Sequence, residues 1–327
     1  MKLFITGGCG FIGSNFVRFV LNNFTDVDII NYDLLTYAAN PLPDFSHSYN
    51  LSDIEKNNNY KFVRGDICNE ILLDKHMKDV DFVVHFAAES HVDNALKNND
   101  VFLNSNTIGT KKLLEAALKN NVKRFHFVST DEVYGSIEKG YFKEDAQLKP
   151  SNIYSVSKAA GELLCQAFWK TYNLPFTITR GANNFGPYQF PEKVIPLFIT
   201  NLLDGKKVPL YGDGLHRRDW IFVEDHCRAI WHVLKNGKTG ESYNVTANNE
   251  LANIELTKLL LEKTDRDESF IEHVTDRPGH DRRYAMNAEK LNELGWRPSY
   301  SFSEALDNTV NWYKNNVSWW KRLKNTK

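Results

Sequence analysis

A glycine-rich turn near the start of the chain constrains its fold more than any other feature. The apolar segment Lys2 to Thr6 predicts a buried strand, and the apolar periodicity from about Ser14 to Asn22 predicts a helix. The turn between them has the spacing Gly7-x-x-Gly10-x-x-Gly13. Glycine permits a tight turn and a close approach of the backbone to a pyrophosphate, while the helix N-terminus offers amide donors. The sequence therefore predicts a dinucleotide-binding strand–turn–helix unit.

The second predicted strand, Asp28 to Tyr32, indicates which dinucleotide would bind. It ends at Asp33, twenty residues after Gly13. An acid at this place can accept hydrogen bonds from both ribose hydroxyls of adenosine, and it repels a 2′-phosphate. The residue therefore favours NAD over NADP, with a plain turn aspartate as the weaker alternative.

Strands and helices continue to alternate along the first half of the chain. Two further strands are predicted at Tyr60 to Arg64 and Val80 to His85, and a helix at about Val101 to Asn120. Asp66 would either face the adenine amino group or cap the next helix, and these two readings are even. His91 would either line the site or pack as a structural histidine.

The segment from Phe125 to Lys158 carries the candidate chemistry. Its first five residues, Phe125 to Ser129, predict a buried strand that leads directly into Thr130, Asp131 and Glu132. Ligands of open α/β sheets bind outside the carboxyl ends of the strands. A hydroxyl and two neighbouring carboxylates are therefore expected at the binding edge.

Tyr154 and Lys158 form a second candidate group, at the start of a helix predicted through about Tyr172. Residues four apart lie on one helix face, so the ammonium is expected to lower the pKa of the phenol and make it a usable base. Alone, such a pair is more often a solvated helix face, and an Asp-Glu pair is more often a turn. Here the acidic pair and the Tyr-Lys pair follow a nucleotide-binding N-terminus in the right order and spacing, which favours a catalytic role for both.

The second half of the chain changes character after a strand predicted at Phe176 to Arg180. Proline, glycine and aromatic residues cluster from Gly181 through Asp219, which predicts the start of a substrate-binding region. The segment Trp220 to Val223, with a helix from about Glu224 to Lys235, is expected to return to the first domain. The cations Lys193, Arg218, Arg282 and Arg283 would suit a diphosphate.

These elements predict an α/β, Rossmann-like, doubly wound parallel sheet with a smaller, interleaved C-terminal domain. We expect a nucleotide-binding domain over residues 1–182, a returning segment at about 221–248, and mainly substrate-binding material over 183–327.

Composition excludes several other classes of protein. The 327 residues carry a net charge of -1, so no broad field favours nucleic acid. The four cysteines have no metal spacing, which predicts reduced cytoplasmic thiols and no metal site. No apolar run is long enough to cross a membrane, and the N-terminus reads as a strand rather than a signal peptide.

With these residues assembled, the chain resembles the extended short-chain dehydrogenase/reductase family and, within it, the dTDP-glucose 4,6-dehydratases. The resemblance covers nearly the whole chain, and its most specific part is the Thr-Asp-Glu triplet. It rests on the runs Thr6 to Ser14, Asp33 to Ala38, Ala87 to Asp93, Thr130 to Gly135, Tyr154-x-x-x-Lys158, Asn183 to Lys193, Gly212 to Trp220 and Arg277 to Tyr284.

The resemblance implies a lyase that uses tightly held NAD in deoxysugar biosynthesis. Tyr154, with Lys158 and Thr130, would serve oxidation at sugar C4, after which Glu132 would remove the C5 proton and Asp131 would protonate the leaving C6 hydroxyl. The implied cofactor contacts are Gly7, Gly10, Phe11, Ile12, Gly13, Asp33, Leu34, Leu35, Thr36, Asp66, Ile67, Phe86, Ala87, Ala88, Ser105, Tyr154, Lys158 and Asn183. The implied nucleotide-sugar contacts are Ser90, Thr130, Asn183, Asn184, Lys193, Val194, Pro209, Tyr211, Arg218, Asn253, His280 and Tyr284.

Three positions depart from the family pattern. Asn94 stands where an arginine is usual, Ser105 where a threonine is usual, and Gly181-Ala182 where Cys-Ser is usual. These departures concern the details of cofactor contact rather than the reaction.

Two alternatives to this function stay open. One is an epimerase or dehydratase of another nucleotide hexose carrying UDP, CDP or GDP, and the other is a non-catalytic NAD-binding sensor. The fate of the product, rhamnose or another sugar, is also open.

A homodimer is expected because two helices carry more apolar residues than one core-facing stripe needs. The predicted helix from Tyr154 contains Leu163, Leu164, Phe168 and Trp169. The resemblance implies that such helices pair into a four-helix bundle.

Overall fold

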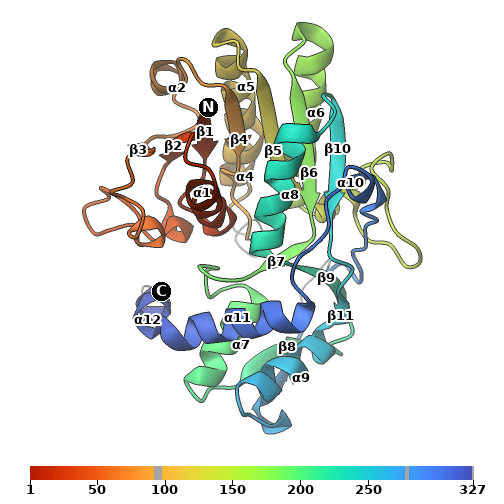
Figure 1. The fold of residues 1–327 in the computed structure, drawn as a ribbon. Coiled ribbons are helices and arrows are strands. Elements are labelled where there is room, and N and C mark those ends of the chain that lie inside the picture. Colours follow the sequence, from red (N-terminus) through yellow and green to blue (C-terminus); the bar gives the residue numbers. More distant parts are fainter. Residues whose placement is uncertain (92–97, 277–279, 326–327) are drawn as a thin grey trace.

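A parallel seven-stranded sheet forms the centre of the structure, which is a computed structural model that describes residues 1–91, 98–276 and 280–325 (Figure 1). The departure at Asn94 and residues 277–279 of the Arg277 to Tyr284 run lie outside this described part. In sheet order the strands are β10 (Glu241–Val245), β6 (Phe176–Gly181), β5 (Arg124–Thr130), β4 (Phe82–His85), β1 (Lys2–Thr6), β2 (Asp28–Asp33) and β3 (Tyr60–Arg64). The predicted fold class is therefore confirmed.

Helices cover both faces of this sheet. One face carries α1 (Phe11–Asn23) and α8 (Val223–Asn236), and the other carries α2 (Glu70–His76), α5 (Thr110–Lys119) and α6 (Ile153–Tyr172) (Figure 1). Side chains of a strand alternate between the two faces of the sheet, so adjacent residues of β1 pack into different hydrophobic cores. Leu3 and Ile5 pack with α1 and α8, whereas Phe4 packs with α5 and α6. The apolar strands of the sequence are thus explained by burial on both sides.

Two predicted boundaries are wrong by a few residues. Helix α1 begins at Phe11, three residues before the expected start, so its first turn overlaps the glycine spacing. Strand β4 begins at Phe82 rather than Val80, because the Asp81 side chain accepts a hydrogen bond from the Lys2 N–H at 2.8 Å and ends the turn there.

The helix predicted at Val101 to Asn120 is interrupted. It consists of α4 (Asn99–Leu103), a π-helical segment over Asn104–Gly109, and α5. A Cβ on Gly109 would lie 2.5 Å from Ile67 Cδ1, so glycine allows the wide turn to pack closely on the loop after β3. Such π-bulges are frequent at functional sites.

The smaller part of the structure lies below the sheet in Figure 1 and has its own apolar core. A three-stranded sheet, β7 (Asn183–Phe185), β9 (Arg217–Phe222) and β11 (Glu250–Ala252), adjoins a two-stranded one, β8 (Val208–Tyr211) and β12 (Ile271–Val274). Its helices are α7 (Val194–Leu203), α9 (Asn253–Lys263), α11 (Phe302–Asn315) and α12 (Val317–Asn325), while the short α10 (Glu289–Glu293) packs against β10.

The segment Trp220 to Val223, expected to return to the first domain, faces both parts, because Ile221 packs with Tyr134 and Tyr243 of the larger part. Trp220 and Phe222 belong to β9 of the small sheet, where they pack against Phe185 of β7. The chain rejoins the large sheet through α8, which packs on α1, and through β10, which pairs with β6.

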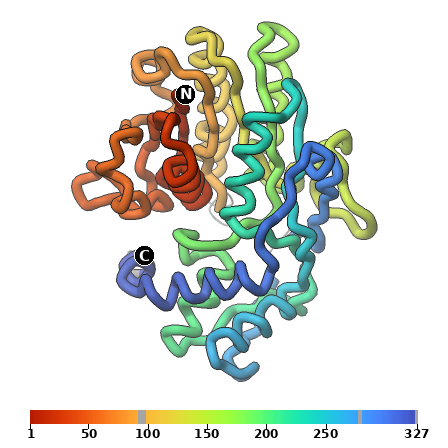
Figure 2. The backbone as a smooth tube through the Cα atoms, viewed as in Figure 1, coloured from red at the N-terminus to blue at the C-terminus, as the bar shows by residue number. Residues whose placement is uncertain are grey.

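The end of the chain returns to its beginning. In Figure 2 the blue C-terminal segment lies beneath the red and orange N-terminal segment. The Arg322 guanidinium lies over the Tyr49 ring, 3.3 Å from its centroid, which places α12 against the loop between β2 and β3.

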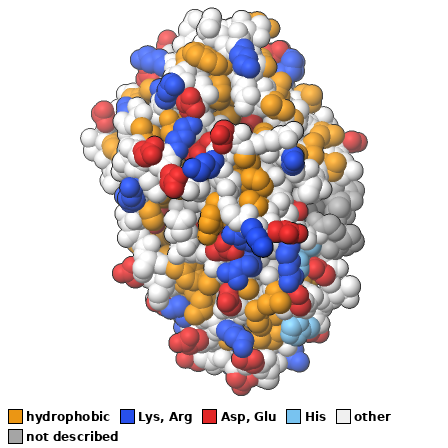
Figure 3. Space-filling model, turned by 90° about the vertical axis from the view of Figure 1, so that its right-hand side faces the viewer, with side chains coloured by type: hydrophobic (Ala, Val, Ile, Leu, Met, Phe, Trp, Pro, Cys, Tyr) orange, Lys and Arg blue, Asp and Glu red, His pale blue; other side chains and the backbone are white. Residues whose placement is uncertain are grey.

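The face drawn in Figure 3 carries charges of both signs together with scattered hydrophobic side chains. Lysine and arginine side chains are interspersed there with aspartate and glutamate. Within the described ranges, no helix combines the length and apolar character that a membrane span requires.

Candidate active site

A cavity of about 460 Å³ opens at the carboxyl ends of β1, β2, β4 and β5. Its lining includes both the glycine turn and the Tyr154–Lys158 pair. Most of the predicted cofactor residues line it, namely Gly7, Gly10, Phe11, Ile12, Gly13, Asp33, Leu34, Thr36, Asp66, Ile67, Phe86, Ala87, Ala88, Ser105, Tyr154 and Lys158. His91 and Asn183 are not among the lining residues.

The glycine turn has no room for side chains. Gly7 has a φ of +69°, and a Cβ there would lie 2.5 Å from the Ala87 nitrogen. A Cβ on Gly13 would lie 2.2 Å from the Gly7 carbonyl oxygen. The turn therefore presents bare backbone and the N-terminus of α1 to the cavity, which is the cradle that a dinucleotide pyrophosphate needs.

Asp33 holds this turn in place from the end of β2. Its Oδ2 accepts the Cys9 N–H at 2.9 Å, and its Oδ1 accepts the Leu35 N–H at 2.8 Å. Burial raises the pKa of the carboxyl, while these two hydrogen bonds oppose the rise. Leu35 itself does not line the cavity, because its side chain packs into the core on the α1 face.

Asp66 lines the cavity and is not the cap of α2. The side chain of Asn69 caps that helix by accepting the Leu72 N–H at 3.1 Å. Asp66 Oδ1 instead accepts the Cys68 N–H at 2.8 Å and stabilises the turn after β3. The capping alternative is therefore wrong, and the adenine contact stays a prediction.

The π-helical segment fixes another wall of the cavity through Asn106. The Asn106 amide accepts the Glu89 N–H at 2.8 Å and donates to the Glu89 carbonyl at 2.9 Å. It also donates to Ser157 Oγ on α6 at 2.9 Å. Asn106 thus ties the loop after β4 to the helix that carries Tyr154, a function that sequence reasoning missed.

The acidic triplet lies where the strand ends and the backbone turns. Strand β5 ends at Thr130, and a 3₁₀ turn begins at once, over Asp131–Tyr134. The Thr130 hydroxyl donates to Asp131 Oδ1 at 3.1 Å, and Asn152 Nδ2 donates to Glu132 Oε2 at 3.3 Å. The turn allows the two adjacent carboxylates to serve one ligand, which a continued strand would not.

The electrostatics of this group place it beside Tyr154. Burial and then the Glu132 charge raise the pKa of Asp131 to about 7. Burial, Glu132 and Asp131 raise the pKa of Tyr154, and a hydrogen bond with Thr130 opposes the rise. The two carboxylates and the phenol therefore act on one another at short range.

The expected effect of Lys158 on Tyr154 is not found in this structure. The Lys158 ammonium donates to the Val128 carbonyl at 2.7 Å and lies 4.2 Å from the centroid of the Phe127 ring. Burial lowers the pKa of Lys158 to about 8. The prediction of a lowered Tyr154 pKa is wrong, because burial and the two carboxylates raise it and the ammonium is bonded to the Val128 carbonyl instead.

Arg218 and Tyr284 join this group from the smaller part. The Arg218 guanidinium lies 4.3 Å from the centroid of the Tyr284 ring, and its charge lowers the pKa of Asp131 against the effect of burial. The Glu132 charge in turn contributes, after burial, to the raised pKa of Tyr284. Residues from β5, β9 and the segment after β12 therefore meet at one place.

Other predicted substrate residues have different surroundings. Ser90 and Lys193 line the cavity, and Lys193 Nζ donates to the Ser90 carbonyl at 2.9 Å. Asn183 Oδ1 is buried and has no hydrogen-bond partner within the described residues. Asn184 uses both ends of its amide internally, on the Ala182 carbonyl and His226 Nδ1, which gives no support to a substrate contact.

Tyr211 and His280 lie together around a small histidine cluster. The His216 and His280 rings stack with centroids 3.9 Å apart, and Asp276 accepts from His280 Nδ1 at 2.7 Å. The donor atoms of His216, Asp276 and His280 lie within 4.8 Å of one another, so this group could hold a metal ion, although none was expected. Val194 begins α7, Pro209 lies in β8 and Asn253 begins α9.

The predicted use of Arg282 and Arg283 for a diphosphate is not supported. Arg282 forms two hydrogen bonds to Asp213, at 2.8 and 2.9 Å. Arg283 does the same with Glu250, at 2.8 and 2.9 Å. Both guanidinium groups are therefore already hydrogen-bonded to carboxylates of the protein.

Sequence reasoning also missed several lining residues. Tyr32 fits over Gly65, where a Cβ would lie 2.2 Å from the ring, and its hydroxyl donates to the Asp66 carbonyl. Glu89 lines the cavity, and burial together with the Glu192 charge raises its pKa. The sequence signal for the Tyr32 ring was Gly65, directly before Asp66, because a side chain at that position would collide with the ring.

Comparisons with known proteins agree with this geometry. Residues 4–309 match the family described as GDP-mannose 4,6 dehydratase. A dTDP-glucose 4,6-dehydratase of Streptomyces niveus is 45% identical over 99% of this chain and 96% of its own length.

Solved structures give the same result. The dTDP-glucose 4,6-dehydratase DesIV of Streptomyces venezuelae, crystallised with NAD, is 45% identical, with a TM-score of 0.94 over 99% of this chain and 100% of that one. A UDP-glucose 4-epimerase of Thermotoga maritima is 29% identical, with a TM-score of 0.88 over 97% and 100% of the two chains. The chain therefore belongs to the nucleotide-sugar 4,6-dehydratase family, among the dTDP-glucose 4,6-dehydratases.

Proposed function

We propose that the chain dehydrates dTDP-glucose to dTDP-4-keto-6-deoxyglucose. The observation that carries this proposal is the Asp131–Glu132 turn beside Tyr154, with a pKa of about 7 at Asp131. Oxidation at C4 needs one base, and elimination across C5 and C6 needs a separate base and acid. The site offers all three groups on adjoining elements.

NAD is the proposed cofactor, and the residues present fit it. The side-chain-free glycine turn would take the pyrophosphate, and Asp33 would take the adenosine ribose. Bound NAD would supply oxidation at C4 and the returning reduction at C6. Asp33 adds selectivity, because its carboxylate repels a 2′-phosphate.

Proton transfers fall to the protein. Tyr154 takes the proton of the C4 hydroxyl, with Thr130 hydrogen-bonded to its phenol. Burial and the two carboxylates raise the pKa of this phenol, so the role would depend on the positive charge that the oxidised nicotinamide of NAD brings to the site. The new ketone acidifies C5, from which Glu132 removes the proton. Asp131 then donates its proton to the C6 oxygen, and water leaves.

The two carboxylates differ in protonation, as this division of work requires. Both cannot easily ionise at close range, so the more buried one retains its proton. Asp131 is 4% exposed, whereas Glu132 is half-buried and accepts a hydrogen bond from Asn152. Asp131 is therefore the acid and Glu132 the base.

The nucleotide sugar would lie between the sheet edge and the smaller part. Arg218 and Tyr284 stand beside the acidic turn, and Lys193 stands at the cavity with Ser90. The dTDP nucleotide follows from the relatives, and another nucleotide hexose is the second candidate because the epimerase relative shares the fold.

A homodimer is also proposed, through the outer surface of α4 to α6. Leu163 is 56% exposed and Ile108 is 45% exposed, whereas Phe168 is buried and Leu164 and Trp169 pack partly into the protein's own core. Leu163 therefore supports pairing, and the other three helix residues named from the sequence do not.

A reducing cytoplasm is the proposed location, and the four free cysteines agree with it.

Incubation with a panel of nucleotide hexoses tests the function. The expected product has lost one water from dTDP-glucose, detected by mass, with less product from UDP-, CDP- and GDP-hexoses. Turnover of another nucleotide alone would reassign the substrate, and a product of unchanged mass would indicate epimerisation.

A further inference from the structure

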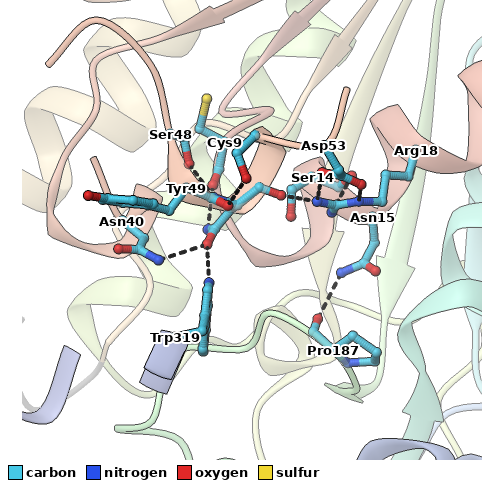
Figure 4. Close-up of polar contacts among 12 residues, drawn as sticks. Cys9, Ser14, Asn15, Arg18, Asn40, Ser48, Tyr49, Asp53, Pro187 and Trp319 are labelled. Atoms are coloured by element: carbon cyan, nitrogen blue, oxygen red, sulfur yellow. Dashed lines mark hydrogen bonds and ion pairs between the residues drawn. The ribbon is translucent and has the colours of Figure 1, made fainter. Parts of the chain in front are cut away.

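Asn50 joins the glycine turn to the C-terminal helix. This fully buried side chain donates from Nδ2 to the Cys9 carbonyl at 2.9 Å. Its Oδ1 accepts from Trp319 Nε1 of α12 at 3.0 Å and from Asn40 Nδ2 at 3.2 Å. Figure 4 shows the Trp319 indole pointing up from α12 toward this group.

Helix α12 decides which way these amides point. An indole N–H and a guanidinium can only donate hydrogen bonds. Trp319 must therefore face the oxygen of Asn50, and Arg322, which donates to Asn40 Oδ1, turns the Asn40 amino group toward Asn50. The Asn50 amino group is left to face Cys9.

Cys9 is held from both sides of the turn. Its carbonyl accepts from Asn50, while its N–H donates to Asp33, the proposed ribose-binding acid. Its sulfur accepts from Asn31 Nδ2 at 3.2 Å. A shift of Asn50 would therefore move the residue between Gly8 and Gly10 and release one restraint on Asp33.

Helix α12 is itself anchored on the smaller part. The Lys324 ammonium donates to Asn201 Oδ1 at 2.8 Å, and Trp320 is buried in the core of α7, α9 and α11. Trp319 also packs against Trp312 and Tyr188, with ring centroids 5.0 and 5.9 Å away. The helix thus bridges the smaller part and the glycine turn.

We propose that Trp319 and Asn50 are positioning residues, through which α12 holds the glycine turn in the shape that binds NAD. This inference rests on NAD as the proposed cofactor. It concerns affinity for the cofactor, because both residues act on the glycine turn and neither is among the residues that line the cavity.

The test measures NAD binding by calorimetry on protein stripped of nucleotide, and kcat at saturating NAD. Trp319→Phe keeps the packing and removes the donor, so its NAD dissociation constant is expected to rise about 3- to 10-fold, the effect of one hydrogen bond. Asn50→Asp places a carboxylate against the Cys9 carbonyl and is expected to weaken binding by more. In both, kcat at saturating NAD stays within about twofold of wild type.

Trp312→Phe is the matched control, since Trp312 belongs to the same aromatic group and donates no hydrogen bond to Asn50. It is expected to bind NAD as wild type does. Equal affinities for Trp319→Phe and Trp312→Phe would overturn the proposal, as would a fall in kcat at saturation without loss of affinity. If Asn50→Asp does not fold, Trp319→Phe alone decides. Wild-type protein that binds no NAD would instead refute the proposed function.

Discussion

The Thr130 hydroxyl donates to the Asp131 carboxylate at 3.1 Å, yet the pKa of Asp131 rises to about 7. A hydrogen bond to the charged form lowers a carboxyl pKa, so burial and the neighbouring Glu132 must outweigh it. The acid that the reaction needs is thereby protonated near neutral pH. This relationship leads to a prediction about stability.

Asp131→Asn is expected to change how stability depends on pH. The folded pKa of about 7 lies above the usual value of about 4, so this carboxyl stabilises the fold at low pH, and the contribution is lost as pH rises through 7. Between about pH 5 and about pH 8, the free energy of unfolding of the variant should rise relative to that of wild type, by up to about 2–4 kcal/mol. Urea unfolding of both proteins measures this, and a difference that does not change with pH contradicts it.

Tyr154→Phe is expected to slow oxidation strongly while NAD still binds. The variant loses the oxygen that accepts the C4 hydroxyl proton, so formation of reduced cofactor in a single turnover should slow about 1,000-fold. Tyr172→Phe is the control, because Tyr172 ends the same helix and is 54% exposed. Equal rates in the Tyr154 variant and wild type would remove Tyr154 from the mechanism.

Stripped enzyme should regain activity with NAD and little with NADP. The carboxylate of Asp33 is buried beside the turn and would repel a 2′-phosphate. Asp33→Asn should narrow this preference while weakening NAD binding, because one of the two N–H groups on Asp33 loses its acceptor. Activity titrations with both cofactors measure the ratio, and equal rescue of wild type by NADP speaks against the assignment.

Leu163→Glu is expected to shift a dimer toward monomer. A charge on this exposed apolar residue of α6 would be buried in the proposed interface at a cost of desolvation. Ile71→Glu on α2, where Ile71 is 84% exposed, controls for the charge itself. Light scattering at micromolar concentration reads the mass, and a wild-type monomer would refute the dimer.

Local sequence was enough to predict the sheet and the glycine turn. Strands β1 and β3 begin and end where their apolar patterns predicted, and the glycine spacing marked the turn that follows β1. Both depend on neighbours in the chain, so periodicity and spacing report them.

Contacts between distant segments could not be predicted in this way. Asn106 holds Glu89 across seventeen residues, and Trp319 reaches Asn50 across 269. The pKa of Tyr154 depends on its burial and on the charges of Glu132 and Asp131, which the spacing to Lys158 does not reveal. Likewise, Arg282 and Arg283 looked free for a diphosphate until the fold brought Asp213 and Glu250 to them.

The order of the two carboxylates is the central claim, and exchange of the sugar C5 proton tests it most directly. In deuterated water, Glu132→Gln should still oxidise C4, with bound reduced cofactor forming, but should exchange the C5 proton about 100-fold or more slowly than wild type. Asp131→Asn should keep both oxidation and exchange, and lose the release of water. Exchange at the wild-type rate in Glu132→Gln would show that another group is the base and would contradict this assignment.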